Sequence, residues 1–375
     1  MPDKRNHNDS LTVMQVVPEL KVGGVERGTI EFAGYLQKQG HRPIVVSAGG
    51  PLVEQLSENN ITHIELNVGK KSLSSLKSIK KLKNIMLDRH VDVVHARSRL
   101  PAWLCYWAIK RIKSKKPKFV TTLHGLHSVN RYSSIMARGD AVIAVSQTAQ
   151  DYLIRNFKKQ LGHEPELIYR GIDPQFSYGH VPDLSWLTGW QQKFGTNESI
   201  KTVLLPGRLS QLKGVEHLVR WLKSTKHDCK LLLTADYDES KYSHQVSQLF
   251  AQHGLSERVI WLGIERNMPN LYAAVDVVVS TNNKAESFGR TVLEALSIGK
   301  PVVAFSHGGV DEIMNALFPE GKVPVGNDVA LAQRIDSFLS QKPVVKPHQL
   351  FTNRDMFEKT LAVYQRLLVG GSVNA

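Results

Sequence analysis

A regular alternation between short apolar runs and longer segments of helical periodicity constrains the fold of this chain more than any other feature. The runs include LTVMQVV (11–17), VDVVHAR (91–97) and, in the second half, TVLLPGR (202–208). They are short and rich in β-branched residues, which is typical of strands buried on both faces of a sheet. Strands that alternate with helices form parallel sheets, so the sequence predicts an α/β fold.

The length of the chain and a cluster of proline and glycine near its middle predict two domains. A chain of 375 residues is long enough for two separate hydrophobic cores. Proline and glycine accumulate between about residues 172 and 185, after the first series of strands. We therefore expect one domain over 1–178 and another over 179–352. The last helical pattern, within 353–375, can pack on either of them.

Composition places the chain among ordinary globular proteins, with 42% apolar and 22% charged residues. No run approaches the roughly 18 apolar residues that indicate a membrane span. The first ten residues are polar and lack the apolar centre of a signal peptide. Cys105 and Cys229 lie far apart and suggest neither a disulfide framework nor a zinc site. We expect a cytoplasmic protein.

The net charge of +14 is unevenly distributed. Residues 1–178 contain 27 Lys and Arg against 15 Asp and Glu, which gives +12. Residues 179–375 contain 21 against 19, which gives +2. An anionic partner is therefore expected to bind through the first half of the chain.

Two glycine-containing segments follow predicted strands and precede predicted helices. In PELKVGGVERG (18–28), Gly23 and Gly24 allow a tight turn or a close approach of backbone N–H groups to an anion. In LPGRLSQLKG (205–214), Arg208 and Lys213 lie at the carboxyl edge of a parallel sheet, where α/β folds bind ligands. An arginine can grip a phosphate through two hydrogen bonds, and a lysine adds a mobile charge. Each segment can also be a plain turn with solvated side chains.

The segment AESFGRTVLEALSIG (285–299) holds two glutamates, Glu286 and Glu294. The backbone around Ser287, Phe288 and Gly289 can offer N–H groups at a helix N-terminus, which favours an anion. Eight helical residues rise by about 12 Å, so the two carboxylates are expected to be too far apart to share a proton. They suit two ends of an extended ligand, although Glu286 can also be a capping acid and Glu294 a partly buried helix residue.

Three further polar residues follow strands in the first half. His124 ends the strand in VTTLHGLH (120–127), where it can anchor a ligand, carry a proton or be a satisfied core histidine. Arg97 and Arg99 follow the strand in VHARSRLPAW (94–103) and suit an anionic acceptor, or else are solvated. In the second half, the pair Asp236 and Asp238 has a spacing that can hold a divalent metal, but so short a match also arises by chance.

Residues 69–87 form a basic amphipathic pattern with apolar residues on one face and no acid. Such a helix can lie on anionic lipid, or it can face the core and expose its lysines. A second basic run at 110–118 favours the membrane interpretation. The lysines of the first pattern are Lys70, Lys71, Lys77, Lys80, Lys81 and Lys83.

Taken together, the motifs resemble those of the retaining GT-B glycosyltransferases of family 4. GGVER (23–27), GRLSQLKG (207–214), ESFGRTVLEALSIGKPVVA (286–304) and GGVDEI (308–313) occur in the order of that family, and the resemblance covers nearly the whole chain. The first domain is most similar to enzymes that extend the lipopolysaccharide core, through GGVERGT and VVHARSRLPAW. One departure is Ala235-Asp236, where many members have a Gly-x-Gly turn.

The resemblance implies two Rossmann-like domains facing a central cleft, with a final helix that crosses back to the first domain. It implies no metal and no cofactor besides a nucleotide-sugar co-substrate, UDP- or GDP-linked. Arg208 and Lys213 would hold the diphosphate, Glu286 the sugar hydroxyls and Glu294 the ribose. The remaining implied donor contacts come from Ile264 at the base, from Ser287, Phe288 and Gly289 at phosphate, and from Gly23 and Gly24, with His124 near the reacting sugar.

The function expected from this resemblance is transfer of a hexose, with retained anomeric configuration, to an anionic lipopolysaccharide core or similar glycolipid. Arg97 and Arg99 would bind the acceptor, and the protein would lie peripherally on the cytoplasmic face of the inner membrane. Two alternatives remain open on sequence alone. A nucleotide-sugar epimerase of the same fold would consume donor without acceptor. A basic nucleic-acid-binding protein is disfavoured because the basic runs lack interleaved aromatic residues.

Overall fold

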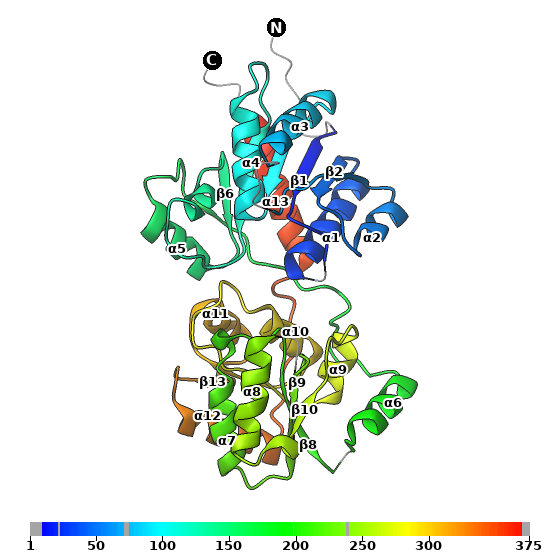
Figure 1. Ribbon diagram of the computed structural model, residues 1–375, viewed down its shortest axis with the longest axis vertical. Coiled ribbons are helices and arrows are strands. Elements are labelled where there is room, and N and C mark those ends of the chain that lie inside the picture. The colour runs from blue at the N-terminus through cyan, green and yellow to red at the C-terminus, as the bar shows by residue number, and fades with distance from the viewer. Residues whose placement is uncertain (1–9, 22, 71–74, 198, 238–239, 370–375) are drawn as a thin grey trace. The chain divides into compact units, whose positions relative to one another are not determined.

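The computed structural model describes residues 10–21, 23–70, 75–197, 199–237 and 240–369 (Figure 1). It divides into two compact units, one formed by 1–171 with 354–375 and the other by 172–353. The first division therefore lies at Gly171, a few residues before the predicted boundary at 178. Within the described residues, no helix is long and apolar enough to cross a membrane.

The first unit is built on a seven-stranded parallel sheet with the order β3-β2-β1-β4-β5-β6-β7. The strands are β1 (Thr12–Val16), β2 (Arg42–Ser47), β3 (Thr62–Glu65), β4 (Val93–Ala96), β5 (Lys118–Leu123), β6 (Ala141–Ala144) and β7 (Glu166–Leu167). The helices are α1 (Gly24–Lys38), α2 (Val53–Glu58), α3 (Ser75–Asp88), α4 (Arg99–Lys110), η1 (Ser133–Ala137), α5 (Gln147–Phe157) and α13 (Asn353–Val369).

The second unit is built on a six-stranded parallel sheet with the order β10-β9-β8-β11-β12-β13. Its strands are β8 (Lys201–Leu205), β9 (Cys229–Leu233), β10 (Val259–Trp261), β11 (Val277–Ser280), β12 (Val302–Phe305) and β13 (Lys322–Val323). Its helices are α6 (Leu184–Phe194), η2 (Gln211–Lys213), α7 (Val215–Ser224), α8 (Lys241–Gln252), η3 (Ser256–Arg258), α9 (Met268–Ala274), α10 (Arg290–Ile298), α11 (Gly308–Leu317), η4 (Pro319–Gly321) and α12 (Asp328–Ser340).

Both sheets share one topology, and it fixes where a ligand can bind. In each, the chain builds three strands outward in one direction and then returns to the other side of the first strand. This is the doubly wound order of Rossmann-like folds, whose ligands bind beyond the carboxyl ends of the strands at the point of reversal. That point lies between β1 and β4 in the first unit and between β8 and β11 in the second. The α/β prediction is confirmed.

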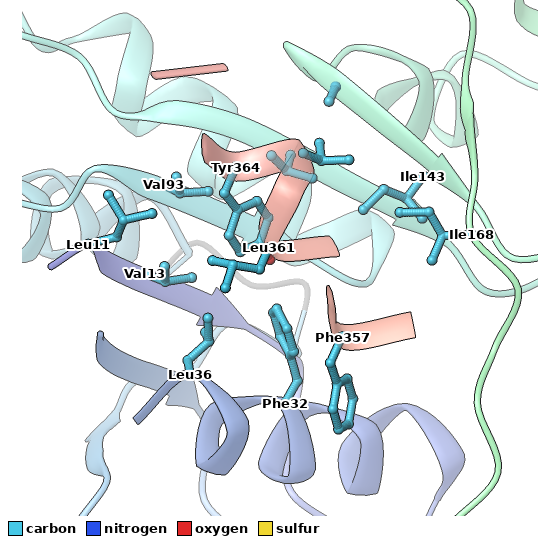
Figure 2. Packing of buried hydrophobic residues seen from close by; sticks show 13 residues of the cluster. Leu11, Val13, Phe32, Leu36, Val93, Ile143, Ile168, Phe357, Leu361 and Tyr364 are labelled. Carbon is cyan, nitrogen blue, oxygen red and sulfur yellow. The ribbon is translucent and has the colours of Figure 1, made fainter. Parts of the chain in front are cut away.

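The final helix α13 belongs to the first unit and completes its core. Phe357, Leu361 and Tyr364 from α13 are buried in one cluster with Phe32 of α1 and strand residues such as Val13 (Figure 2). The Tyr364 hydroxyl also lies 2.5 Å from Nδ1 of the fully buried His95 on β4. A segment more than 200 residues away in sequence therefore supplies both apolar area and a polar partner to this sheet.

Helix α3 buries its apolar face inside the first unit. Ile79, Leu82 and Met86 are buried, whereas Lys77 and Lys80 on the opposite face are exposed. The interpretation in which this helix inserts its apolar residues into lipid is therefore wrong for the described part of the segment. Its exposed lysines can still attract an anionic surface. Residues 71–74 lie outside the described residues.

Candidate functional site

The polar motifs of the second unit meet at its topological reversal. The loop after β8 carries Arg208 and Lys213, and the loop after β11 carries Asn282 and Glu286. Since β8 and β11 are adjacent and parallel, both loops leave the same edge of the sheet. Thr281 ties them together, because its hydroxyl donates to the carbonyl of Lys213 at 2.8 Å.

Lys213 is held in place before any ligand binds. Its side chain is only 14% exposed, and its Nζ lies 3.5 Å from Oε1 of Glu286. The end of the side chain packs against Gly207, where an added Cβ would lie 3.6 Å from Nζ. The Gly207 amide in turn donates to the hydroxyl of Thr234 on the neighbouring loop at 2.7 Å. A cation fixed in this way costs little rearrangement when a negative charge develops beside it.

Glu286 is oriented by two donors. Its Oε1 accepts from the amide of Asn282 as well as lying beside Lys213, and its side chain remains 33% exposed. Asn282 itself is buried, which fixes its position. A carboxylate with one oxygen held by the protein retains acceptor capacity for sugar hydroxyls.

The backbone of the Glu286–Gly289 loop packs directly on the start of α11. The amide of Gly309 donates to the Glu286 carbonyl at 2.9 Å. A Cβ on Gly309 would lie 2.4 Å from Cα of Phe288, so only glycine permits this approach. The ring of Phe288 is buried and meets Phe351 edge-on at 5.9 Å. The GGVDEI motif therefore serves to place the loop that carries Glu286, Ser287 and Phe288.

Glu294 is buried and engaged on both oxygens. Arg290 donates through Nε to Oε1 at 2.7 Å, and the Tyr272 hydroxyl donates to Oε2 at 3.0 Å. Burial, followed by the charge of Glu294, holds the pKa of Tyr272 well above its ordinary value. These bonds fix the carboxylate, whose remaining lone pairs can still accept hydroxyl protons. No role for Arg290 follows from the sequence, whereas the structure shows it as the ion partner of Glu294.

The expected 12 Å rise between Glu286 and Glu294 is wrong. Gly289 is the N-cap of α10, and the helix begins only at Arg290. Four helical steps from Arg290 to Glu294 rise by about 6 Å, and the remaining separation depends on the loop. Helix α10 begins directly after this loop, and an anion at its N-terminus stays a prediction.

The other expected donor contacts lie at the same edge of the sheet. Arg208 is exposed immediately after β8 and is available to a charged ligand. Ile264, beyond the end of β10, is 72% exposed. Asp236 packs its carboxylate against Gly263, where an added Cβ would lie 2.8 Å from Oδ1. Asp238 lies outside the described residues. Within the described part of the chain, no group of acidic, histidine or cysteine side chains is arranged to hold a metal.

In the first unit, Gly23 and Gly24 begin α1 as predicted, but the turn already faces a carboxylate. Gly23 is the N-cap, and an added Cβ there would lie 2.3 Å from Oε2 of Glu26. Burial raises the pKa of Glu26, although backbone N–H groups of the first turn bind it. A phosphate at this turn must therefore share the helix N-terminus with Glu26.

His124 lies at the carboxyl end of β5, beside a small cavity of about 20 Å³. Both of its ring nitrogens are shielded from solvent. Burial, with further contributions from the nearby charges of Arg170 and Arg97, holds its pKa well below the ordinary value. The ring is therefore neutral and weakly basic at physiological pH, which suits it to hydrogen-bond with a hydroxyl rather than to take up its proton.

Arg97 and Arg99 occupy different environments. The guanidinium of Arg97 is buried, donates twice to Oε1 of Gln15 at 2.9 and 3.1 Å, and lies over the Phe32 ring. Arg99 is half-buried at the start of α4, where it donates to the Ser133 hydroxyl at 3.2 Å. Arg97 thus lines the small cavity from within, whereas Arg99 lies nearer the surface.

Several residues at these sites were missed by sequence reasoning. Arg170 lines the cavity with His124 and donates to the Gly24 carbonyl at 2.7 Å. It lies in the segment ELIYRGID (166–173), three residues beyond the end of β7 at Leu167, so its place at a strand end was a usable signal. Asn282 follows β11 in the same way. Gln15 and Tyr272 gave no such signal, because each lies inside an ordinary apolar pattern.

The arrangement in the second unit suits a ligand with both a phosphate and several hydroxyls. Lys213 and Arg208 supply positive charge, whereas Glu286 and Glu294 supply fixed hydroxyl acceptors. The loop between them can offer backbone N–H groups.

Known protein families and solved structures match nearly the whole length of this chain. A family model described as Glycosyltransferase Family 4 matches residues 22–176, and one described as Glycosyl transferases group 1 matches residues 188–354. A crystal structure of a glycosyltransferase from Rickettsia africae ESF-5 is 32% identical, with a TM-score of 0.81 over 96% of this chain and 99% of that chain. HepE from Anabaena, in complex with UDP and glucose, is 23% identical, with a TM-score of 0.73 over 96% and 95%. N-acetyl-alpha-D-glucosaminyl L-malate synthase from Bacillus anthracis is 25% identical over 315 residues, 78% of each chain.

Proposed function

Because the chain belongs to the glycosyltransferases with a GT-B fold, we propose that it transfers a hexose from a nucleotide-sugar to an anionic glycolipid such as lipopolysaccharide core, with retained configuration. The observation that carries the proposal is the Lys213–Glu286 pair at 3.5 Å, at the reversal point of the second sheet. The pair joins a cation suited to the leaving diphosphate with a carboxylate suited to the sugar.

The donor is proposed to bind across the loops after β8, β11 and β10. Arg208 and Lys213 hold the diphosphate, and Glu286 binds hydroxyls of the sugar. Glu294, fixed by Arg290 and Tyr272, binds the ribose. Ile264 lies near the base through its backbone. We propose a UDP-sugar first, since HepE is named as a complex with UDP and glucose, and a GDP-sugar as the alternative.

The proposed chemistry is a front-face displacement without a covalent intermediate. The bond between the sugar and the diphosphate breaks, and the acceptor hydroxyl attacks from the same face. Its proton passes to the leaving phosphate oxygen. Lys213 and Arg208 stabilise the charge that develops on the diphosphate. The neutral ring of His124 is suited to hydrogen-bonding with the reacting sugar rather than to donating a proton. We propose that no metal is required.

An anionic acceptor at a membrane surface is supported by charge. The first 178 residues carry a net +12, and Lys77, Lys80 and Lys81 are exposed on α3. Each lysine near an anionic membrane contributes about 1 kcal/mol of attraction. Arg99 lies near the surface in the same unit and is proposed to bind acidic groups of the acceptor. Arg97 is buried and bound to Gln15, so it can take part only through the small cavity that it lines. The proposed location is the cytoplasmic face of the inner membrane.

A second candidate acceptor is a small dicarboxylate. It is favoured by the similarity to the malate synthase, which extends over 78% of both chains. Such an acceptor would use the same donor site and need no membrane surface. The alternative of a non-enzymatic nucleic-acid-binding protein is set aside by the family assignment.

The test is a transfer screen with UDP-, GDP- and ADP-linked sugars against three conditions: core lipid, L-malate and no acceptor. We expect sugar transfer to core lipid from one donor, and transfer slower by at least about two orders of magnitude with the Lys213→Met variant. Transfer to L-malate alone would replace the glycolipid with the second candidate. Donor consumption that needs no acceptor would instead favour the epimerase, and no reaction with any donor would contradict the proposed function.

A further inference from the structure

A second cavity lies at the opposite edge of the first sheet, where β1, β2 and β3 begin. Its volume is about 270 Å³, and its polar lining includes Thr12, Gln37, His41, Arg42, Asn60 and Arg89. Thr12 and Arg42 are the first pair in the register of β1 and β2, so both lie at the end of the sheet that borders the cavity. Gln37, near the end of α1, donates to the Asn60 carbonyl at 3.2 Å and closes one wall.

The cavity is positively charged. Arg42 and Arg89 are exposed side chains on its lining, and the lining contains no acidic residue. Neither guanidinium forms an ion pair within the described part of the chain. Two arginines on one small cavity present paired N–H donors, the arrangement that binds phosphate and carboxylate groups.

Thr12 adds a donor at the cavity floor. The residue is 2% exposed, and its Oγ1 has no hydrogen-bond partner among the described residues. Buried hydroxyls in native proteins are nearly always paired, so an unpaired one on a cavity wall indicates a ligand or water partner. His41 offers the cavity a second hydrogen-bond donor. Its Nδ1 accepts from the Leu11 amide at 3.2 Å, which leaves the neutral ring protonated on Nε2.

This cavity is separate from the proposed acceptor region. Gly23, Arg97 and His124 follow the carboxyl ends of their strands, whereas Thr12 and Arg42 stand at the amino ends. Strands of five or six residues span about 16–20 Å. A ligand in this cavity therefore cannot touch His124 or the cavity beside it.

We propose that this cavity binds a small phosphomonoester through Arg42, Arg89 and the Thr12 hydroxyl. The volume of about 270 Å³ is close to the lower end of ordinary small-molecule sites, which begin near 300 Å³. It accommodates a phosphate on a body of a few carbon atoms. The two guanidinium groups bind the phosphate, and Gln37 and Asn60 at the rim suit hydroxyls on the body.

The experiment is isothermal titration calorimetry of the full chain with glycerol 3-phosphate and with inorganic phosphate, at low salt and without nucleotide. Arg42→Ala and Arg89→Ala are each expected to weaken binding about tenfold or more, because each removes a charged hydrogen bond. Thr12→Val keeps the shape of the side chain and is expected to weaken binding several-fold. Both arginines are exposed, so their removal should leave folding intact.

Two control variants separate this site from other phosphate sites. Arg155→Ala removes the same charge from an exposed position on α5 and should leave binding unchanged. Lys213→Met alters the proposed donor site and should leave the part of the binding that depends on Arg42 and Arg89 unchanged. No binding by the unmodified chain would overturn the proposal. Binding that is lost with Lys213→Met but kept with Arg42→Ala would overturn it as well.

Discussion

Replacing Lys213 with methionine should cost this enzyme at least about two orders of magnitude in kcat. The substitution keeps the length of the side chain and removes its charge. The 14% exposure of Lys213 and its packing against Gly207 place the charge at a defined point. In the resting protein that charge is shared with Glu286, 3.5 Å away.

The magnitude follows from the charge that develops on the leaving diphosphate. Two unit charges at 4 Å interact by about 4 kcal/mol at an effective dielectric constant near 20. Solvent access through the 33% exposed Glu286 screens part of this, so a loss of about 3 kcal/mol in the transition state is reasonable. At 1.36 kcal/mol per tenfold, that corresponds to about 150-fold.

The assay is steady-state transfer, with kcat and donor KM determined at saturating acceptor. We expect a fall in kcat with a smaller rise in KM, because the interaction strengthens as the bond breaks. Lys213→Arg is the matched control, since it keeps the charge. Thermal unfolding should change little, because Glu286 keeps its bond to Asn282. Unchanged kcat with a raised KM would refute the reasoning, since Lys213 would then bind donor and transition state equally.

Three further predictions follow from other parts of the structure. Burial holds the pKa values of His95 and His124 well below their ordinary value, so unfolding takes up protons once the pH falls below about 6.5. The free energy of unfolding should then decline by up to about 1.4 kcal/mol per pH unit for each histidine. Urea midpoints at pH 7.5, 6 and 5 test this, and His95→Gln should make the decline less steep. Leu361→Ala on α13 should destabilise the first unit by about 2–5 kcal/mol, measured by denaturant unfolding, whereas Lys359→Ala on the exposed face should leave the midpoint unchanged. Addition of EDTA should leave the transfer rate unchanged, because Arg208 and Lys213 supply the charge that a metal would otherwise provide; a rate restored only by added Mg²⁺ or Mn²⁺ would contradict this.

The fold was predictable because its signals are local. Most strands of the two sheets are short apolar runs rich in β-branched residues, and the order of runs and helices already implies parallel pairing. The positions of Arg208 and Lys213 followed directly, since residues after a parallel strand emerge at one edge of its sheet. Strand β13 was missed because it contains only Lys322 and Val323.

The site details that escaped prediction depend on contacts between distant residues. The sequence could not show that Tyr272 and Arg290 fix Glu294, because Tyr272 lies 22 positions away on another helix. The predicted helical rise from Glu286 to Glu294 was too long, because Gly289 has a positive φ and α10 begins only after it. The sequence left the environment of α3 open because an amphipathic helix has the same pattern whether its apolar face meets lipid or a core.

The same limit applies to Arg97. A strand-end arginine looks solvated in sequence, and only the fold shows its guanidinium buried against Gln15, 82 positions away. Burial of His124 lowers the pKa of this histidine, and the nearby charges of Arg170 and Arg97 lower it further. The buried charge of Arg97 and the lowered pKa of His124 therefore arise from packing in the first unit rather than from any motif.

We propose above all that this chain transfers a sugar from a nucleotide-sugar to an acceptor with retained configuration. A proton NMR time course tests it most directly, with the donor identified by the transfer screen and with core lipid present or absent. We expect donor to disappear only when acceptor is present, and the anomeric proton of the product to keep the coupling typical of the donor configuration. Donor loss at the same rate without acceptor would contradict transfer, and a product with inverted configuration would contradict the mechanism.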